Sequence, residues 1–375
     1  MSIRLADRCI TFATLALSLA LISPPARADH ITGSFGAALS PVDVEVSHDN
    51  AYVYVSLAGG FADPVTGMGN RVLKIDASSL TQVAAAQTTI GLGLMAIRPY
   101  VPTAVPPVPQ DRLYVVSAPD YAIKVFSLTP SLAHVATIPL GCTPEDVSFD
   151  PNGNRAYVSC QSPATLKVIN VTGGTNGWGS LLQTINLDGT PHGLTVTNQT
   201  GVGVRVYVAI EKGFPFDPKV AVVDPVTALV SYFSIPPPPV TSGPAQTASQ
   251  PVGVGASLDG SKIYVTLVSS QTFIFQASNP TGPFTQVFSY GNSPVRLATV
   301  NTPSGERVYI TDAVATSTGQ WSVTRINGAT GTRLGPLYGF HKKPAGIAGS
   351  PNGLRVYVAS SGWNVVDVID TTLPD

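Results

Sequence analysis

A short apolar segment centred on one tyrosine recurs seven times along this chain, and it constrains the fold more than any other feature. Successive tyrosines lie 43 to 60 residues apart, which is the span of one four-stranded β-propeller blade with its loops. The seven segments are Val53-Tyr54-Val55, Leu113-Tyr114-Val115, Ala156-Tyr157-Val158, Val206-Tyr207-Val208, Ile263-Tyr264-Val265, Val308-Tyr309-Ile310 and Val356-Tyr357-Val358.

Most units also begin with a proline about 13 residues before the tyrosine, and a turn lies between the two, as at Asp150-Pro151-Asn152-Gly153. Such turns are hairpin signals, because glycine tolerates the positive φ that they need. The second unit departs most, with Leu94 in place of the proline and a proline-rich insertion from Pro99 to Pro109. The other starts are Pro41, Pro144, Pro191, Pro251, Pro294 and Pro344.

The two ends of the chain indicate how the ring closes. Further strands follow each tyrosine segment, but the last unit reaches Asp370 with too few residues left for a fourth strand. The segment from Ile31 to Leu39 precedes the first proline and belongs to no unit. The sequence therefore predicts an all-β protein that folds as a single seven-bladed β-propeller, its last blade closed by the N-terminal strand. A six-bladed ring with one degenerate unit is the alternative.

The pattern from Pro344 to Asp370, with Ser350-Pro351-Asn352-Gly353 before Val356-Tyr357-Val358, resembles the YVTN-type (YncE-like, lactonase-like) β-propeller repeat. The resemblance covers nearly all of the chain beyond its N-terminal segment. It implies the propeller fold but no single activity, since proteins with this repeat include scaffolds, surface proteins and enzyme subunits.

Residues 1–28 have the layout of a cleaved secretory signal peptide. Arg4 and Arg8 precede an apolar run from Cys9 to Ile22, and Ala26-Arg27-Ala28 is an A-x-A cleavage site. The alternative is a membrane anchor, but the apolar run is shorter than the roughly 20 residues that a spanning helix needs. We therefore expect no membrane span and a propeller over residues 29–375, in a periplasmic or secreted protein.

Charge and cysteine content narrow the classes of function. The net charge is −1 and only 11% of residues are charged, so there is no basic excess for a nucleic-acid partner. Cys142 and Cys160 are the two cysteines beyond the signal segment, and in an oxidising compartment they are expected to form a disulfide. No C-x-x-C or adjacent histidine accompanies them, so no metal site is predicted.

Polar residues close to the blade-start prolines are candidates for a site at the mouth of the central channel, where they could bind a polar ligand or ion. The alternative is that polar side chains simply line a hydrated channel, and that His192 is a structural histidine. Long insertions are expected on the same top face, at 58–70, 211–218, 236–250 and 313–320. The alternative is that these loops have lengthened by neutral sequence change, without a function. The candidates are Asp43, Glu145, Asp146, His192, Arg296, His341, Lys342 and Lys343.

The chain carries no G-x-S-x-G, H-E-x-x-H, C-x-x-C-H or G-x-G-x-x-G signature. The sequence thus favours a binding module that takes an unknown small molecule or protein on its top face, without a predicted cofactor. The alternative is an enzyme or enzyme subunit, such as a lactonase-like hydrolase or the propeller subunit of a quinone-dependent dehydrogenase. Catalysis would need a convergent group of side chains at the channel mouth.

Overall fold

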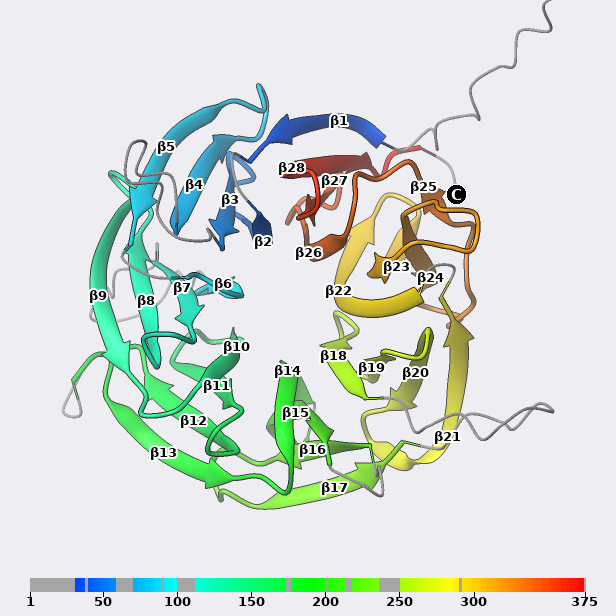
Figure 1. Cartoon of the computed structure of the whole chain (residues 1–375). Helices are drawn as coiled ribbons and strands as arrows, with labels where there is room; N and C mark the ends of the chain where they lie inside the picture. The colour runs from blue at the N-terminus through cyan, green and yellow to red at the C-terminus, as the bar shows by residue number, and fades with distance from the viewer. Residues whose placement is uncertain are drawn as a thin grey trace, which may run out of the picture.

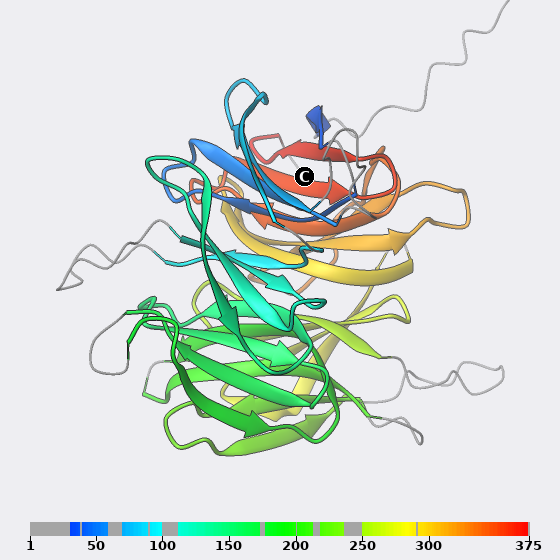
Figure 2. The same cartoon turned by 60° about the vertical axis from the view of Figure 1, so that its left-hand side comes forward.

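Seven four-stranded antiparallel sheets surround a central channel in the computed structural model (Figure 1). The structure describes residues 31–37, 40–58, 70–88, 91–99, 112–172, 177–199, 201–212, 218–235, 250–289 and 292–373. Within these ranges all regular structure is β-strand. Figure 2 shows the sheets following one another round the ring as separate twisted fans. The predicted seven-bladed propeller is confirmed, and the six-bladed alternative is wrong.

In blades 1 to 6 the strands follow one another outward from the channel in chain order, and in blade 7 the outermost strand is β1. Blades 1 to 3 are formed by β2 (Pro41–Val46), β3 (Tyr52–Leu57), β4 (Arg71–Asp76) and β5 (Gln82–Gln87); β6 (Met95–Ile97), β7 (Arg112–Ser117), β8 (Ala122–Ser127) and β9 (Ala133–Pro139); and β10 (Pro144–Phe149), β11 (Arg155–Cys160), β12 (Thr165–Asn170) and β13 (Leu181–Asn186). Blades 4 and 5 are formed by β14 (Thr190–Gln199), β15 (Gly203–Glu211), β16 (Lys219–Val223) and β17 (Val230–Ser234); and β18 (Pro251–Ala256), β19 (Lys262–Leu267), β20 (Gln271–Gln276) and β21 (Asn279–Phe288). Blade 6 is formed by β22 (Asn292–Thr302), β23 (Gly305–Val314), β24 (Ser322–Asn327) and β25 (Leu337–Tyr338), and blade 7 by β26 (Pro344–Gly349), β27 (Arg355–Ser360), β28 (Val365–Asp370) and β1 (Ile31–Gly36).

The N-terminal strand closes the ring, as predicted. Strand β1 pairs antiparallel with β28, so that Ser34 lies opposite Asp367 and Phe35 opposite Val366. Phe35 is buried in the core between blades 7 and 1. The first and last parts of the described chain are therefore held in one sheet, and blade 7 has no unpaired outer edge at β28. Leu39, the end of the predicted closing segment, lies outside the described residues.

The seven repeat tyrosines all lie on second strands and are buried. Each belongs to a core that it shares with the following blade: Tyr54 packs with residues of blade 2, for example, and Tyr157 with residues of blade 4. Tyr357 completes the circle, because it belongs to the same core as Val44 and Val55 of blade 1. The hydrophobic core is thus a set of layers between neighbouring blades rather than one central mass.

The blade-start prolines mark a β-bulge at the top of the inner strand. In all six blades that carry this proline, the register between the first and second strands shifts directly after it, as between Pro41 and Asp43. Proline suits this position because it has no N–H to donate to the ladder. Blade 2 differs from the prediction. Met95 lies opposite Val115 as Val147 lies opposite Val158, so Leu92, not Leu94, corresponds to the proline.

A disulfide joins Cys142 to Cys160, as predicted, with the two Cα atoms 5.8 Å apart. Cys160 ends β11 and lies opposite Pro144, while Cys142 precedes β10, so the bridge closes the top of the blade 3 hairpin. Both side chains are buried in the core between blades 2 and 3.

Removal of β1 should destabilise the whole ring, although the segment is short and terminal. A chain that begins at Ala37 exposes the β28 edge and loses Phe35 from the core between blades 7 and 1. We expect a melting temperature lower by several degrees and concentration-dependent self-association. Calorimetry and light scattering would measure both, with a chain that begins at Ile31 as the control. Equal melting temperatures and a monomeric truncated chain would contradict the closure model.

Replacement of both cysteines by alanine should lower the free energy of unfolding by about 3 kcal/mol, because the bridge closes a loop of 18 residues in the unfolded chain. Urea denaturation of the two proteins, each with and without reductant, measures the loss. Reductant should weaken the natural protein only. If the natural protein yields two free thiols without reductant, the bridge does not form.

Candidate functional site

A cavity of about 520 Å³ opens at the top of the central channel, the end at which the inner strands begin. Its wall comes from blades 1, 2, 3, 6 and 7. Apolar residues such as Leu94, Val116 and Val295 form most of it, and Glu145, Arg296 and Lys343 are its charged residues. Three of the residues predicted from the sequence therefore share this cavity, although they come from three blades.

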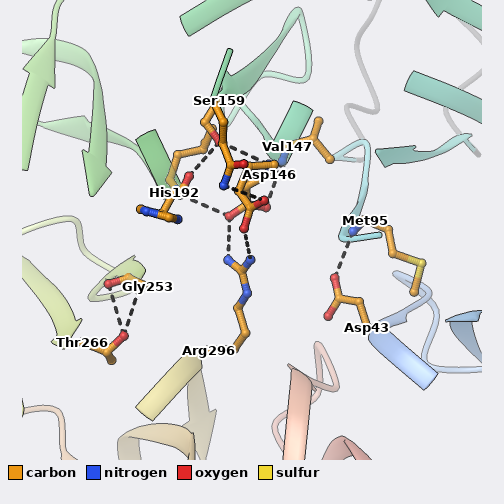
Figure 3. Close-up of polar contacts among 12 residues, drawn as sticks. Asp43, Met95, Asp146, Val147, Ser159, His192, Gly253, Thr266 and Arg296 are labelled. Carbon is orange, nitrogen blue, oxygen red and sulfur yellow. Dashed lines mark hydrogen bonds and ion pairs between the residues drawn. The ribbon is translucent and has the colours of Figure 1, made fainter. Parts of the chain in front are cut away.

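The side chains of Arg296 and Asp146 meet across the channel itself. Arg296 leaves blade 6 and places its Nη1 atom 2.9 Å from Oδ2 of Asp146 in blade 3 (Figure 3). Its Nη2 atom lies 4.0 Å from Oε1 of Glu145. Gly193 of blade 4 lies beside the guanidinium, and its lack of a side chain allows the close approach of the next inner strand, β18. A Cβ atom there would lie 3.2 Å from Arg296 Nη1 and 2.6 Å from the Val252 carbonyl oxygen.

Asp146 and Asp43 also join neighbouring blades through their carboxylates. Asp146 Oδ2 accepts a hydrogen bond from the Leu194 N–H of blade 4, at 3.1 Å. Asp43 Oδ2 accepts the equivalent bond from the Met95 N–H of blade 2, at 2.9 Å. Both aspartates stand two residues after a blade-start proline, so the bulge directs their side chains at the next inner strand. Their first role is therefore to tie the blades together beside the cavity.

Burial shifts the acidity of these carboxyl groups. It raises the pKa of Asp43 to about 7, against the lowering effect of the Met95 N–H and of Arg296. It also raises the pKa of Asp146, which Arg296 lowers in turn. Glu45, which the sequence reasoning missed, has its pKa raised well above the usual range by burial, then by Asp43 and Asp146. The two-residue spacing from Asp43 could have indicated it, because residues i and i+2 of a strand share a face.

His192 lies on the other side of the Arg296–Asp146 bridge from Asp43 (Figure 3). Its Nε2 atom is 3.0 Å from Oε2 of Glu211 in the same blade. The other carboxylate oxygen of Glu211 accepts a hydrogen bond from Gln250, at the entrance to blade 5. His192 does not line the cavity, and its part in ligand binding stays a prediction.

His341 is held away from the cavity by the third strand of blade 7. Its Nδ1 atom lies 2.6 Å from Oδ1 of Asp367, a fully buried residue of β28 that also accepts a hydrogen bond from Ser360. The ring of Trp363 packs beside the imidazole, with centroids 5.6 Å apart. The sequence places His341 near a blade start, but it does not show that a buried aspartate takes up its side chain.

The predicted top-face insertions lie largely outside the described residues. The exception is 313–320, where Ala313 lines the cavity. Among the described residues there is no cluster of three potential metal ligands. No helix long and apolar enough to cross a membrane occurs in the part of the chain that the structure covers.

Comparisons with known proteins show the fold. No protein-family model and no curated protein matches the chain. Among solved structures, the chain is similar to a structure of Kuenenia stuttgartiensis hydrazine synthase. The TM-score is 0.69 and the sequence identity 16%, over 94% of this chain and 99% of that one. It is also similar to the β-propeller domain of Cps50 (Swd1) from Myceliophteria thermophila, with a TM-score of 0.64 and 8% identity over 91% and 98% of the two chains. At these identities the likeness concerns the fold alone.

Asp43→Asn should stabilise the protein increasingly as the pH rises from about 4 to 7. The unfolded chain loses the Asp43 proton near pH 3.9, whereas the folded protein keeps it up to about pH 7, so natural Asp43 costs stability over this interval. Asparagine still accepts the Met95 N–H bond but buries no charge. Urea denaturation at pH 4 to 8 measures the difference, which should be flat above pH 7.

Asp76→Asn is the control for this pH dependence. The Ser78 hydroxyl, chiefly, lowers the pKa of Asp76 to about 2, so the effect of its replacement should not change between pH 5 and 7. A stability difference for Asp43→Asn that is also independent of pH would contradict the raised pKa of Asp43.

Proposed function

We propose that this protein is an exported β-propeller that binds a small ligand at the channel mouth on its top face. The observation that carries the proposal is the cavity of about 520 Å³, which has an apolar wall and three charged residues. Cavities of roughly 300–1,000 Å³ with a few placed polar groups are typical of small-molecule sites. A merely hydrated channel would not need so apolar a wall.

The charges of the wall indicate the chemistry of the ligand. Arg296 is engaged by Asp146, and Glu145 accepts a hydrogen bond from Gln161 at 3.2 Å. Lys343 is exposed and forms no ion pair with any described residue. We therefore propose a ligand with an apolar body and one anionic or hydroxylated group that faces Lys343.

A binding role is favoured over catalysis by the way in which the charges pair. Arg296 and Asp146 neutralise one another across the channel, whereas a catalytic centre needs side chains that converge on a substrate. The seven tyrosine repeats support membership of the YVTN-type propellers, which is part of the proposal. Lactonase-like hydrolysis and a subunit role in a quinone-dependent dehydrogenase are less favoured for the same reason.

Export is the second half of the proposal. Residues 1–28 are proposed to be removed as a signal peptide, which leaves residues 29–375 in the periplasm or outside the cell. The Cys142–Cys160 disulfide supports this location, because structural disulfides persist in oxidising compartments.

An apolar anionic dye, 8-anilinonaphthalene-1-sulfonate, tests the cavity. We expect saturable binding that Ala345→Phe abolishes by filling the cavity, and that Lys343→Met weakens by about tenfold through loss of the ammonium. Fluorescence titration measures both. Lys342→Met is the matched control, because Lys342 is adjacent in sequence to Lys343 but does not line the cavity. Unchanged dye binding in both Ala345→Phe and Lys343→Met would refute a ligand site at the channel mouth.

A further inference from the structure

A second cavity, of about 360 Å³, lies between blades 1 and 2 at the opposite end of the strands from the channel mouth. The turn between β2 and β3 and the residues that follow β8 form its rim. Tyr52, Ile97 and Leu128 supply apolar wall, and Ser47 and Asp49 supply polar groups. Its place in the fold separates it fully from the site proposed above.

Lys74 of β4 is the unusual residue in this wall. Its side chain is buried, at 8% exposure, yet the ammonium forms no ion pair with any described residue. Nζ donates one hydrogen bond, to the Leu128 carbonyl oxygen at 3.2 Å, and lies 3.8 Å from the centroid of the Tyr52 ring. The Tyr54 ring centroid lies 6.0 Å from Nζ, and the charge of Lys74 contributes to lowering the pKa of Asp49. The ammonium has three N–H donors, and these contacts leave it without a paired carboxylate, which is costly for a buried charge. By contrast, the equally buried Lys124 pairs with Asp120 at 2.5 Å.

Asp49 does not fill this role, although it lines the same cavity. Its Oδ1 atom accepts bonds from the Ser47 hydroxyl at 2.6 Å and from the Ala51 N–H at 3.0 Å, within its own turn. An anion that enters the cavity would therefore meet the free N–H bonds of Lys74 on one side and be repelled weakly by Asp49 on the other.

We propose that this inter-blade cavity binds a small organic carboxylate, whose charged end pairs with Lys74 and whose apolar body lies against Ile97 and Leu128. A carboxylate supplies the counter-charge and the hydrogen-bond acceptors that Lys74 lacks. The cavity volume is at the lower end of the range for small-molecule sites, which suits a single ring or a short chain.

Benzoate is the probe for this site, and benzamide is its uncharged analogue of the same shape. Calorimetric titration should show benzoate binding that is weakened about tenfold or more by Lys74→Met and strengthened about two- to fivefold by Asp49→Asn. Benzamide should bind about tenfold more weakly than benzoate. Inorganic phosphate, which has no apolar body, should also bind weakly.

Two control variants make the result specific. Lys167→Met removes an equally buried lysine whose ammonium contacts Thr184 and does not line this cavity, and it should leave benzoate binding unchanged. Lys343→Met alters only the channel mouth and should also leave it unchanged. Circular dichroism and melting curves confirm that each variant folds. Equal binding of benzoate and benzamide, or benzoate binding unaffected by both Lys74→Met and Asp49→Asn, would overturn the proposal.

Discussion

Each blade buries the tyrosine of its second strand against the blade that follows, and this contact holds the ring together. A tyrosine of this kind removes roughly 150–250 Å² from water, or about 4–6 kcal/mol of transfer free energy at about 25 cal/mol per Å². No blade can obtain this burial alone, since the partner surface always belongs to its neighbour. Tyr357 reaches its partner only because β1 completes blade 7 and the ring closes onto blade 1.

The electrostatics of the channel follow from that closure. Seven inner strands surround one axis, so polar side chains that are far apart in sequence meet around the same channel. The positive charge of Arg296 is paired with the carboxylate of Asp146. Asp43 and Glu45 have no such partner among the described residues, and burial raises the pKa of both carboxyl groups. Closure of the ring therefore raises the pKa values of these carboxyl groups, whereas Lys343 at the cavity wall stays exposed.

The blades could be predicted from the sequence because their signals are local. The tyrosine segments, the prolines and the glycine turns each act within a few residues, and even the closing strand follows from a count of strands at the two ends. Blade 2 shows the limit, because without its proline the register could not be read, and Leu94 was placed two residues out of step. The candidate site was less predictable, since Arg296 pairs with Asp146, a partner 150 residues away in the sequence. The capture of His341 by Asp367 likewise depends on a partner 26 residues away.

The two ends of the channel strands offer different chemistry for a structural reason. At the top, the bulges after the prolines turn residues such as Glu145 and Arg296 toward the axis, where several blades share one cavity. At the other end, the cavity beside the turn between β2 and β3 is lined by residues of blades 1 and 2 only. A site of the second kind depends on one pair of neighbours, and a buried charge such as Lys74 can arise in it without disturbing the other six interfaces. The two proposed sites share no lining residue, so we expect their binding energies to be independent.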